Sequence, residues 1–504
     1  MKKHILKLTL ALVVLLITAQ VQAGPQEDLS KACQSGNLDA VKKAIADGAQ
    51  VNTLDVAGNP AITYAFFWPD IVKYLLENKA DPNLGSTTVL FQASFYSSLD
   101  VLKLILDAGA DPNKPMVVDA SVTFKTMLAS EKAKGKDANK YLIKAYEDGI
   151  KNAKPIENYP LPSVITNTNC VPCLQLLLDK GAKINLGITD GTLIHTFAAG
   201  GASKEYRKTT NAAIKKSIEP YGYTVPDWYL NMPADRMGEP EEILKLLLGK
   251  GLAINEKNAG VKGGIPAQTP LETALGAGLG NKKEVMLALI ANGSDVKITS
   301  DWYGPEIFQA AQTGFTEVVK AMVEKGADVN TEGTFFGQTE GASLKGYTPL
   351  IIAAYEDNLD MVKYLIGAGA KTDAGVEGRF FNPKTSCLTK VSDKTAIYYA
   401  IENGNVPMVK FMVDADVKWW KHLKIHQIKE RSISQGINGL GQAVTIYTTE
   451  CFDAGEYLPS MYVNAVAGNK KINAKNKMDD KPGMSQEQKD GLKDLIASMK
   501  AKGI

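Results

Sequence analysis

A phrase that recurs nine times along the chain constrains its fold more than any other feature. Each copy is an amphipathic run, followed by Gly or a substitute and then by Asp-x-Asn or a variant of it. A second short helical pattern precedes the clearest copies, as in 346–370, so the repeating unit is a pair of helices. Such pairs bury their apolar faces on their neighbours, so the chain cannot be divided into independent globular domains. The copies lie at 44–52, 75–83, 104–113, 176–185, 246–255, 288–297, 321–330, 364–373 and 411–419.

The residues at the ends of this unit fit two successive helices. Pro349, which follows Thr348, suits the first turn of a helix, where a backbone N–H has no partner to lose. Gly326 and Gly369 fall at the end of the second helix, where a left-handed backbone conformation is needed. Lys79 replaces glycine at the same place in the second copy, at a cost of about 1 kcal/mol.

The repeated pattern resembles the ankyrin repeat over essentially the whole chain after residue 23. The resemblance implies an all-α solenoid of about nine to ten helix-turn-helix repeats with long hairpin-loop insertions. It also implies a protein that binds a protein or peptide through its hairpin fingers and concave face, without enzymatic activity or a cofactor. An inhibitor or immunity-type role is one form of this function. His195, in Thr-Leu-Ile-His, matches the family's Thr-Pro-Leu-His phrase, in which the histidine is structural.

The spacing of the repeats predicts where insertions lie. Successive helix ends are 30 to 72 residues apart, against about 33 in the family. A helical stretch at 121–151 predicts a helix pair packed on the solenoid. The repeats occupy 24–113 (repeats 1–3) and 161–419 (repeats 4–9), and a degenerate capping repeat occupies 458–504. A helical insertion at 114–160 and a second insertion at 420–457 separate these parts. Further insertions lie within repeats 4–9, at 201–239, 331–346 and 374–393.

The first 23 residues have the pattern of a secretory signal peptide. Three lysines precede an apolar run, and small residues lead to a cleavage site after Ala23. We expect export from a bacterial cell into the periplasm, with release into the medium or an uncleaved anchor as alternatives. No other apolar run approaches the ~20 residues of a membrane span.

The charge balance gives no support for nucleic-acid binding. The chain carries 57 basic and 55 acidic residues, and loss of the first 23 residues would remove three lysines. A nucleic-acid surface needs an excess of Lys and Arg, so the expected partner is a protein or peptide, bound by a monomer.

The five cysteines predict different environments. Cys33 aligns with a small, close-packed position, which favours a buried free thiol. Cys387 and Cys451 lie in successive long insertions, and we expect them to form a disulfide. Cys170 and Cys173 form a C-x-x-C pair at a helix start, which is consistent with a local disulfide, with two packed thiols or with thiol-disulfide redox chemistry. The redox function is the alternative to protein binding.

Histidines give little support for a metal or catalytic site. His422 and His426 are four residues apart, so they could share one helix face, but Leu423 stands where a zinc protease carries its Glu.

Aromatic doublets in the insertions are the candidate partner-binding residues. Large aromatic side chains dominate protein interfaces, although the same rings could instead pack the long loops on one another. The candidates are Trp302, Tyr303, Phe335, Phe336, Phe380, Phe381, Trp419, Trp420, Trp228 and Tyr229.

Overall fold

Helices dominate the computed structural model, which divides into two compact units. Unit 1 comprises Met1–Gly260 and Thr269–Asn292, and unit 2 comprises Val261–Gln268 and Gly293–Ile504. The described residues are 24–135, 139–167, 170–186, 191–201, 215–216, 224–226, 238–260, 266–276, 282–300, 304–333, 343–382, 387–415, 423–427, 435–437, 443–445, 455–459, 462–463 and 484–503.

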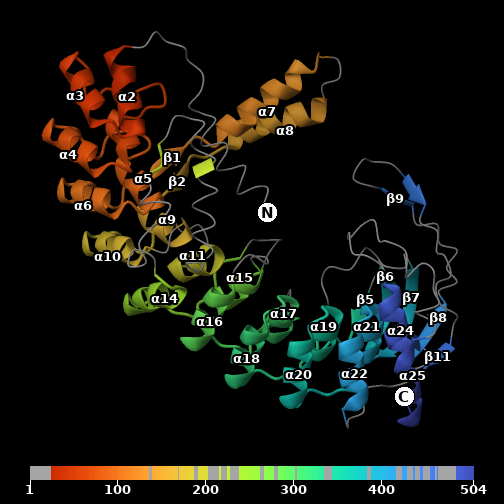
Figure 1. Ribbon diagram of the computed structural model, residues 1–504. Coiled ribbons are helices and arrows are strands. Elements are labelled where there is room, and N and C mark those ends of the chain that lie inside the picture. Colours follow the sequence, from red (N-terminus) through yellow and green to blue (C-terminus); the bar gives the residue numbers. More distant parts are fainter. Residues whose placement is uncertain are drawn as a thin grey trace. The chain divides into compact units, whose positions relative to one another are not determined.

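Unit 1 is a stack of six helix pairs (Figure 1). The first helix of each pair contacts the first helix of the next pair, and the second helices do the same, so the pairs form a continuous solenoid within the unit. The pairs are α2 (Pro25–Ser35) with α3 (Leu38–Ala46), η1 (Ala61–Ala65) with α4 (Pro69–Glu77), α5 (Val89–Phe95) with α6 (Leu99–Asp107), α9 (Pro160–Asn167) with α10 (Val171–Asp179), α11 (Leu193–Gly200) with α14 (Pro240–Gly249), and α15 (Pro270–Gly276) with α16 (Lys283–Ala291).

Unit 2 is built from the same kind of helix pairs. Three pairs stack through their first helices, and two short helices, α24 (Gln486–Asp494) and α25 (Ile496–Ala501), follow near the C-terminus, where α24 contacts α22. The described residues of the two units thus contain nine pairs, which confirms the predicted helical repeat fold. The pairs of unit 2 are α17 (Glu306–Gln312) with α18 (Thr316–Glu324), α19 (Pro349–Tyr355) with α20 (Leu359–Gly367), and α21 (Ala396–Asn403) with α22 (Val406–Asp414).

The ends of the second helices adopt the left-handed backbone that the sequence requires. Gly326 and Gly369 have φ angles of 92° and 90°, and Lys79 takes the same conformation with φ 67°. A residue with a Cβ is strained there, so the rest of the repeat determines this geometry.

A five-stranded antiparallel sheet in unit 2 is the main departure from the expected fold. Three insertions that the sequence predicts as loops contribute strands to it, because their backbone groups pair with one another. Its order is β11-β8-β7-β6-β5, formed by β5 (Ser343–Lys345), β6 (Val376–Asn382), β7 (Cys387–Lys394), β8 (Leu423–Gln427) and β11 (Gly455–Tyr457). Two small hairpins complete the described strands of unit 2, β3 (Thr299–Ser300) with β4 (Gly304–Pro305) and β9 (Gln435–Ile437) with β10 (Ala443–Thr445).

The sheet also corrects the expectation for His426. Its backbone belongs to β8 and pairs with Lys390 of β7, so a shared helix face with His422 is wrong. His422 itself lies outside the described residues.

The insertion between the third and fourth pairs forms a helical arm. Strands β1 (Met116–Val118) and β2 (Ile156–Asn158) pair at its base, and helices α7 (Ser121–Ala133) and α8 (Lys140–Asn152) pack on each other. Figure 1 shows both helices extending away from the stacked pairs of unit 1. The expectation that this helix pair packs on the solenoid is therefore wrong.

No helix in the described ranges combines the length and apolar character that crossing a membrane requires.

Candidate functional site

Asparagine side chains join successive repeats at the end of the repeated phrase. Asn52 Nδ2 donates to the carbonyl of Lys79 at 2.9 Å, and its Oδ1 accepts from the amide of Asp81 at 2.8 Å. Asn83 makes the same two bonds one repeat later, to Gly109 and Asp111. Each asparagine therefore satisfies backbone groups at the next helix end, which would otherwise lack partners.

The same bonds continue across two of the insertions. Asn113 reaches Gly181 O at 3.0 Å and accepts from the amide of Lys183 at 2.8 Å, although the arm lies between them in the sequence. Asn330 bonds in the same way to Gly369 and Lys371. The insertions therefore leave the stack without changing its register.

An aspartate holds the turn before three of these four asparagines. Asp81, Asp111 and Asp328 each accept, through Oδ1, the backbone N–H two residues later, at 2.8 to 2.9 Å. This is the Asx-turn that Asp favours, and it explains the spacing of Asp-x-Asn.

Hydrogen bonds also join the hairpin fingers of unit 1 to one another. The amide of Ser86 donates to Gly58 O at 3.2 Å, and the amide of Val117 donates to Ser86 O at 3.0 Å. Asn59 Oδ1 accepts from the amide of Thr87 at 2.8 Å. Two fingers and the β1–β2 hairpin are thus linked through their backbones in sequence order.

The first finger is also fixed internally by Asp55. Its Oδ1 accepts from the amides of Ala57 and Asn59 at 2.8 and 3.0 Å, and its Oδ2 accepts from the hydroxyl of Tyr64. A finger held in this way loses little conformational freedom when it binds a partner.

Four aliphatic side chains are exposed on these linked fingers. Leu54 is 46% exposed and Val56 86%, while Val117 and Ile156 are 43% and 47% exposed. Ile156 lies opposite Val118 in the β1–β2 register, so its side chain is on the other face of this ribbon from Val117. We call the surface formed by residues 54–58, 84–86 and 116–118 the finger surface.

The charges near the finger surface already have local partners. Lys114 Nζ donates to the carbonyl of Asn83, and Glu157 accepts from the hydroxyl of Tyr159 at 2.6 Å. The hydrogen bond to Glu157 raises the pKa of Tyr159. An exposed aliphatic surface with few free charges is suited to binding apolar side chains of a partner.

Most of the predicted aromatic residues lie outside the described residues. These are Trp302, Tyr303, Phe335, Phe336, Trp419, Trp420, Trp228 and Tyr229. Phe380 and Phe381 belong to β6, where their backbones lie opposite Thr389 and Leu388. Their role in partner binding stays a prediction.

Three residues of the predicted repeat motif, His195, Thr348 and Pro349, lie at helix starts. His195 is 3% exposed, and its Nδ1 accepts from the amide of Thr192 at 3.0 Å in a capping box of α11. Thr348 caps α19 by accepting from the amide of Ile351 at 3.3 Å, and Pro349 is the first residue of that helix. These contacts give both positions a structural role.

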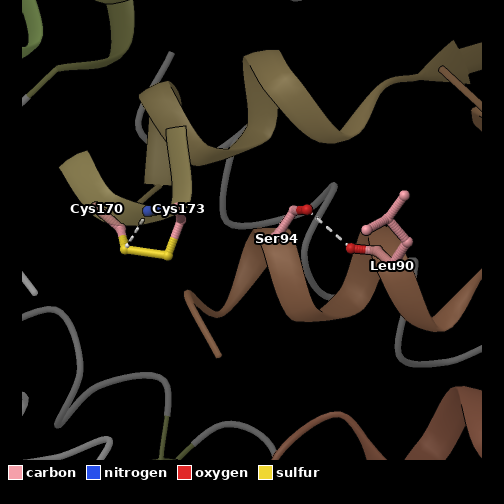
Figure 2. The surroundings of a disulfide bond; sticks show 4 residues. All are labelled: Leu90, Ser94, Cys170 and Cys173. Carbon is pink, nitrogen blue, oxygen red and sulfur yellow. Dashed lines mark hydrogen bonds between the residues drawn. A yellow bond between two sulfur atoms is a disulfide. The ribbon is translucent and has the colours of Figure 1, made fainter. Parts of the chain in front are cut away.

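A disulfide joins Cys170 and Cys173 at the start of α10 (Figure 2). Cys170 is the N-cap, and its sulfur accepts from the amide of Cys173 at 3.2 Å. Both residues are fully buried, so a substrate thiol has no access to either sulfur. The geometry therefore does not favour the redox alternative.

Cys33 and Cys387 lie within the described residues, and Cys451 does not. Cys33 is a free thiol, fully buried, and its burial raises its pKa to about 12. The backbone of Cys387 lies in β7, and Cys451 is outside the described residues, so their disulfide stays a prediction.

Sequence reasoning missed the finger surface. Its exposed aliphatic residues, Leu54, Val56 and Val117, lie between the asparagine of one repeat and the next helix, or at the base of the arm. Their signal was weak, because single Val and Leu residues are common in loops and on surfaces.

Comparison with known proteins gives ankyrin matches. The family model "Ankyrin repeats (3 copies)" matches residues 29–116, 276–375 and 307–421. Similar proteins include Alpha-latrocrustotoxin-Lt1a of Latrodectus tredecimguttatus, 38% identical over 109 residues, which are 21% of this chain and 7% of the relative. A second is Putative ankyrin repeat protein R598 of Acanthamoeba polyphaga mimivirus, 34% identical over 113 residues, 22% of this chain and 36% of the relative.

A third relative is the Ankyrin repeat domain-containing protein SAT10 of Stachybotrys chartarum, 31% identical over 103 residues. That match covers 19% of this chain and 5% of the relative. The chain therefore spans well under half the length of each of these relatives. Together with the helix pairs and their asparagine links, the matches show ankyrin repeats in residues 29–116 and 276–421 of this chain.

Proposed function

We propose that this chain is a non-enzymatic scaffold that binds a protein or peptide through the finger surface of unit 1. Ankyrin repeats generally mediate protein–protein interaction. The observation that carries the proposal is the exposure of Leu54, Val56 and Val117 on loops that are fixed by hydrogen bonds. Preorganised fingers lose little entropy on binding, and burial of these side chains supplies the driving force.

The proposal extends to the compartment. The signal-like residues 1–23 support export into the periplasm or the medium, so the partner would be an envelope or extracellular protein. An inhibitor or immunity-type role is one form of this binding function. We further propose that the chain acts as a monomer.

A photo-crosslinking residue at position 56 tests the proposal. The control position is Lys73, which is exposed on α4, a second helix of the stack. The full chain is expressed in its source cells, and adducts are identified by mass spectrometry. We expect one defined protein to crosslink at position 56 and not at position 73.

The identified protein then allows a binding measurement. We expect Val56→Asp with Val117→Asp to weaken its binding by about tenfold or more, because the loss of ~1.4 kcal/mol of apolar contact changes affinity tenfold. The control variant, Lys73→Gln with Lys103→Gln, should bind as the original chain does. Equal loss in both variants, or no adduct at position 56, would refute the proposed function.

A further inference from the structure

Strand β2 is the outer edge of a backbone ladder in unit 1. The amide of Ser86 donates to Gly58 O at 3.2 Å, and the amide of Val117 in β1 donates to Ser86 O at 3.0 Å. Strand β1 then pairs with β2 in antiparallel register, with Val117 opposite Glu157. Among the described residues, β2 is therefore the last segment of this ladder.

The backbone groups of Glu157 point away from the ladder. The N–H of Val117 donates to Ser86, on the side of β1 that faces away from β2. Opposite residues of an antiparallel pair alternate between those that exchange hydrogen bonds and those that do not. Val117 and Glu157 are thus a pair without mutual hydrogen bonds, and Ile156 and Asn158 bond to β1. The N–H and C=O of Glu157 face the other side, which we call the open side of β2.

The open side of β2 is exposed. Pro155, Ile156 and Glu157 all belong to the exposed residues of unit 1, and Ile156 is 47% exposed. No other residue in the described part of the chain donates to, or accepts from, the backbone of Glu157. Backbone groups on such an edge can pair with another strand.

The residues that flank Glu157 extend this edge. Tyr159 precedes Pro160, and a residue before proline is restricted to extended conformations. Pro155 lacks an N–H but keeps its carbonyl. By the alternation along a strand, the carbonyl of Pro155 and the N–H of Tyr159 lie on the same side as the groups of Glu157. The open side thus offers acceptors and donors at alternate positions, as an added strand requires.

The side chains of β2 determine which strand fits best. The carboxylate of Glu157 accepts from the Tyr159 hydroxyl at 2.6 Å and has lone pairs for a further donor. A basic residue directly opposite Glu157 is therefore favourable, and an acidic one is unfavourable. Ile156 lies on the other face of the ribbon, where it is exposed for contact with an apolar side chain.

A second copy of this chain is a poor occupant of the open side. Glu157 is the central residue of β2, so the two-fold antiparallel pairing of two β2 strands places Glu157 opposite Glu157. Like charges that lie directly opposite each other destabilise a strand pair. The edge therefore favours a segment of a different polypeptide that carries a positive charge.

We propose that the open side of β2 binds an extended peptide segment, which adds as a strand and carries a basic residue next to a β-branched or aromatic residue. The backbone bonds supply the affinity, while Glu157 and Ile156 supply the selectivity. This inference goes beyond the proposed function and does not depend on it, because β2 lies outside the finger surface and binds through backbone groups.

Selection from a displayed peptide library tests this inference. The probe is a library of random short peptides on phage, selected on the immobilised full chain. We expect the enriched peptides to share a Lys or Arg next to a β-branched or aromatic residue. A selection that enriches no peptide would overturn the inference, but it leaves the finger surface untouched, since crosslinking at position 56 tests that surface separately.

Two substitutions at one position then separate the backbone of Glu157 from its side chain. Glu157→Pro removes the N–H, and the fold tolerates it because this N–H faces away from β1. We expect it to weaken the binding of an enriched peptide about tenfold or more. The matched control, Glu157→Gln, keeps the N–H and loses only the charge, so it should weaken the same peptide by about fivefold or less. Undiminished binding by Glu157→Pro would exclude strand addition.

Hydrogen exchange of the unaltered full chain gives a readout that depends on no variant. We expect the amides of Glu157 and Tyr159 to exchange fast without peptide and about tenfold or more slowly with an enriched peptide bound. Slow exchange without peptide would mean that another part of this chain already covers the edge. Protection by the peptide that spares Glu157 would place its site elsewhere. Either result would overturn the inference.

Discussion

A buried ion pair in unit 2 provides a quantitative prediction about stability. Lys394, the last residue of β7, places its Nζ 2.7 Å from both carboxylate oxygens of Glu402 in α21. The two side chains are only 1% and 10% exposed. The hydroxyl of Tyr462 also donates to Glu402, and the ring centroid of Tyr399 lies 4.1 Å from the Lys394 Nζ. The pair therefore connects the sheet, the last helix pair and residue 462.

Replacement of Lys394 by Met should destabilise this part of unit 2 strongly. Burial lowers the pKa of Lys394, and the Glu402 carboxylate opposes this effect by stabilising the charged amine. Removing the amine leaves the carboxylate buried without its counter-charge, which costs about 3–5 kcal/mol. Additional replacement of Glu402 by Gln removes the second charge but keeps an oxygen for the Tyr462 hydroxyl. The double variant should therefore recover most of the loss.

Native-state hydrogen exchange of the α21 amides measures this effect without assuming that the whole repeat array unfolds in one step. We expect the free energy of opening to fall by about 3–5 kcal/mol in Lys394→Met and by clearly less in Lys394→Met with Glu402→Gln. A single variant that loses less than about 1 kcal/mol would refute the reasoning, since that is the value of an exposed ion pair. A double variant as unstable as the single one would also refute it.

Three further predictions concern the repeats and the cysteines. Asn113→Ala removes the bonds to Gly181 and Lys183, and it should lower the free energy of unfolding in urea by about 1–3 kcal/mol. The control Lys180→Ala removes an exposed ion pair with Asp107 and should lower it by less than about 1 kcal/mol. Equal losses in the two variants would contradict the role of the asparagine. Burial raises the pKa of the Cys33 thiol from 9.0 to about 12, so the thiol loses its proton at lower pH in the unfolded chain than in the folded protein. The contribution of the protonated Cys33 to the free energy of unfolding is therefore complete below pH 9 and should be lost as the pH rises toward 12. Iodoacetamide at pH 8 should accordingly leave Cys33 unlabelled in the folded protein, and rapid native labelling would show that the thiol is not buried. Dithiothreitol should reduce the buried Cys170–Cys173 bond only under unfolding conditions, and catalysis of insulin reduction by the native protein would restore the redox alternative.

The helix pairs could be predicted from the sequence because their signals are local. Apolar spacing, the proline after Thr348 and the glycines at helix ends all act within one repeat. The capping role of His195 was predictable for the same reason, since its partner Thr192 is three residues away. Even the strained position at Lys79 follows from its alignment with glycines in other copies.

The sheet could not be predicted in the same way. Its strands pair across segments far apart in the chain, as Lys390 with His426, and each strand is eight residues long or less. A five-residue stretch such as Leu423–Gln427 satisfies a helical spacing and a strand alternation equally well. Only the long-range backbone pairing decides between them.

The finger surface could not be predicted from the sequence because it is defined by the solvent exposure of its aliphatic side chains. Val56 and Val117 resemble core residues in the sequence. Their exposed side chains, on loops fixed by finger-to-finger hydrogen bonds, appear only in the structure. The predicted aromatic doublets remain candidates for a second contact region. The direction of the arm also depends on tertiary packing, since α7 and α8 satisfy each other's apolar faces.

Hydrogen exchange of the full chain, with and without the crosslinked partner identified at position 56, tests the central claim most directly. We expect slower exchange at Ser86 and Val117 and around residues 54–58, with no change in the second helices α4 and α6. Protection confined to α4 and α6, with the fingers unchanged, would contradict the claim that this chain binds its partner through the finger surface.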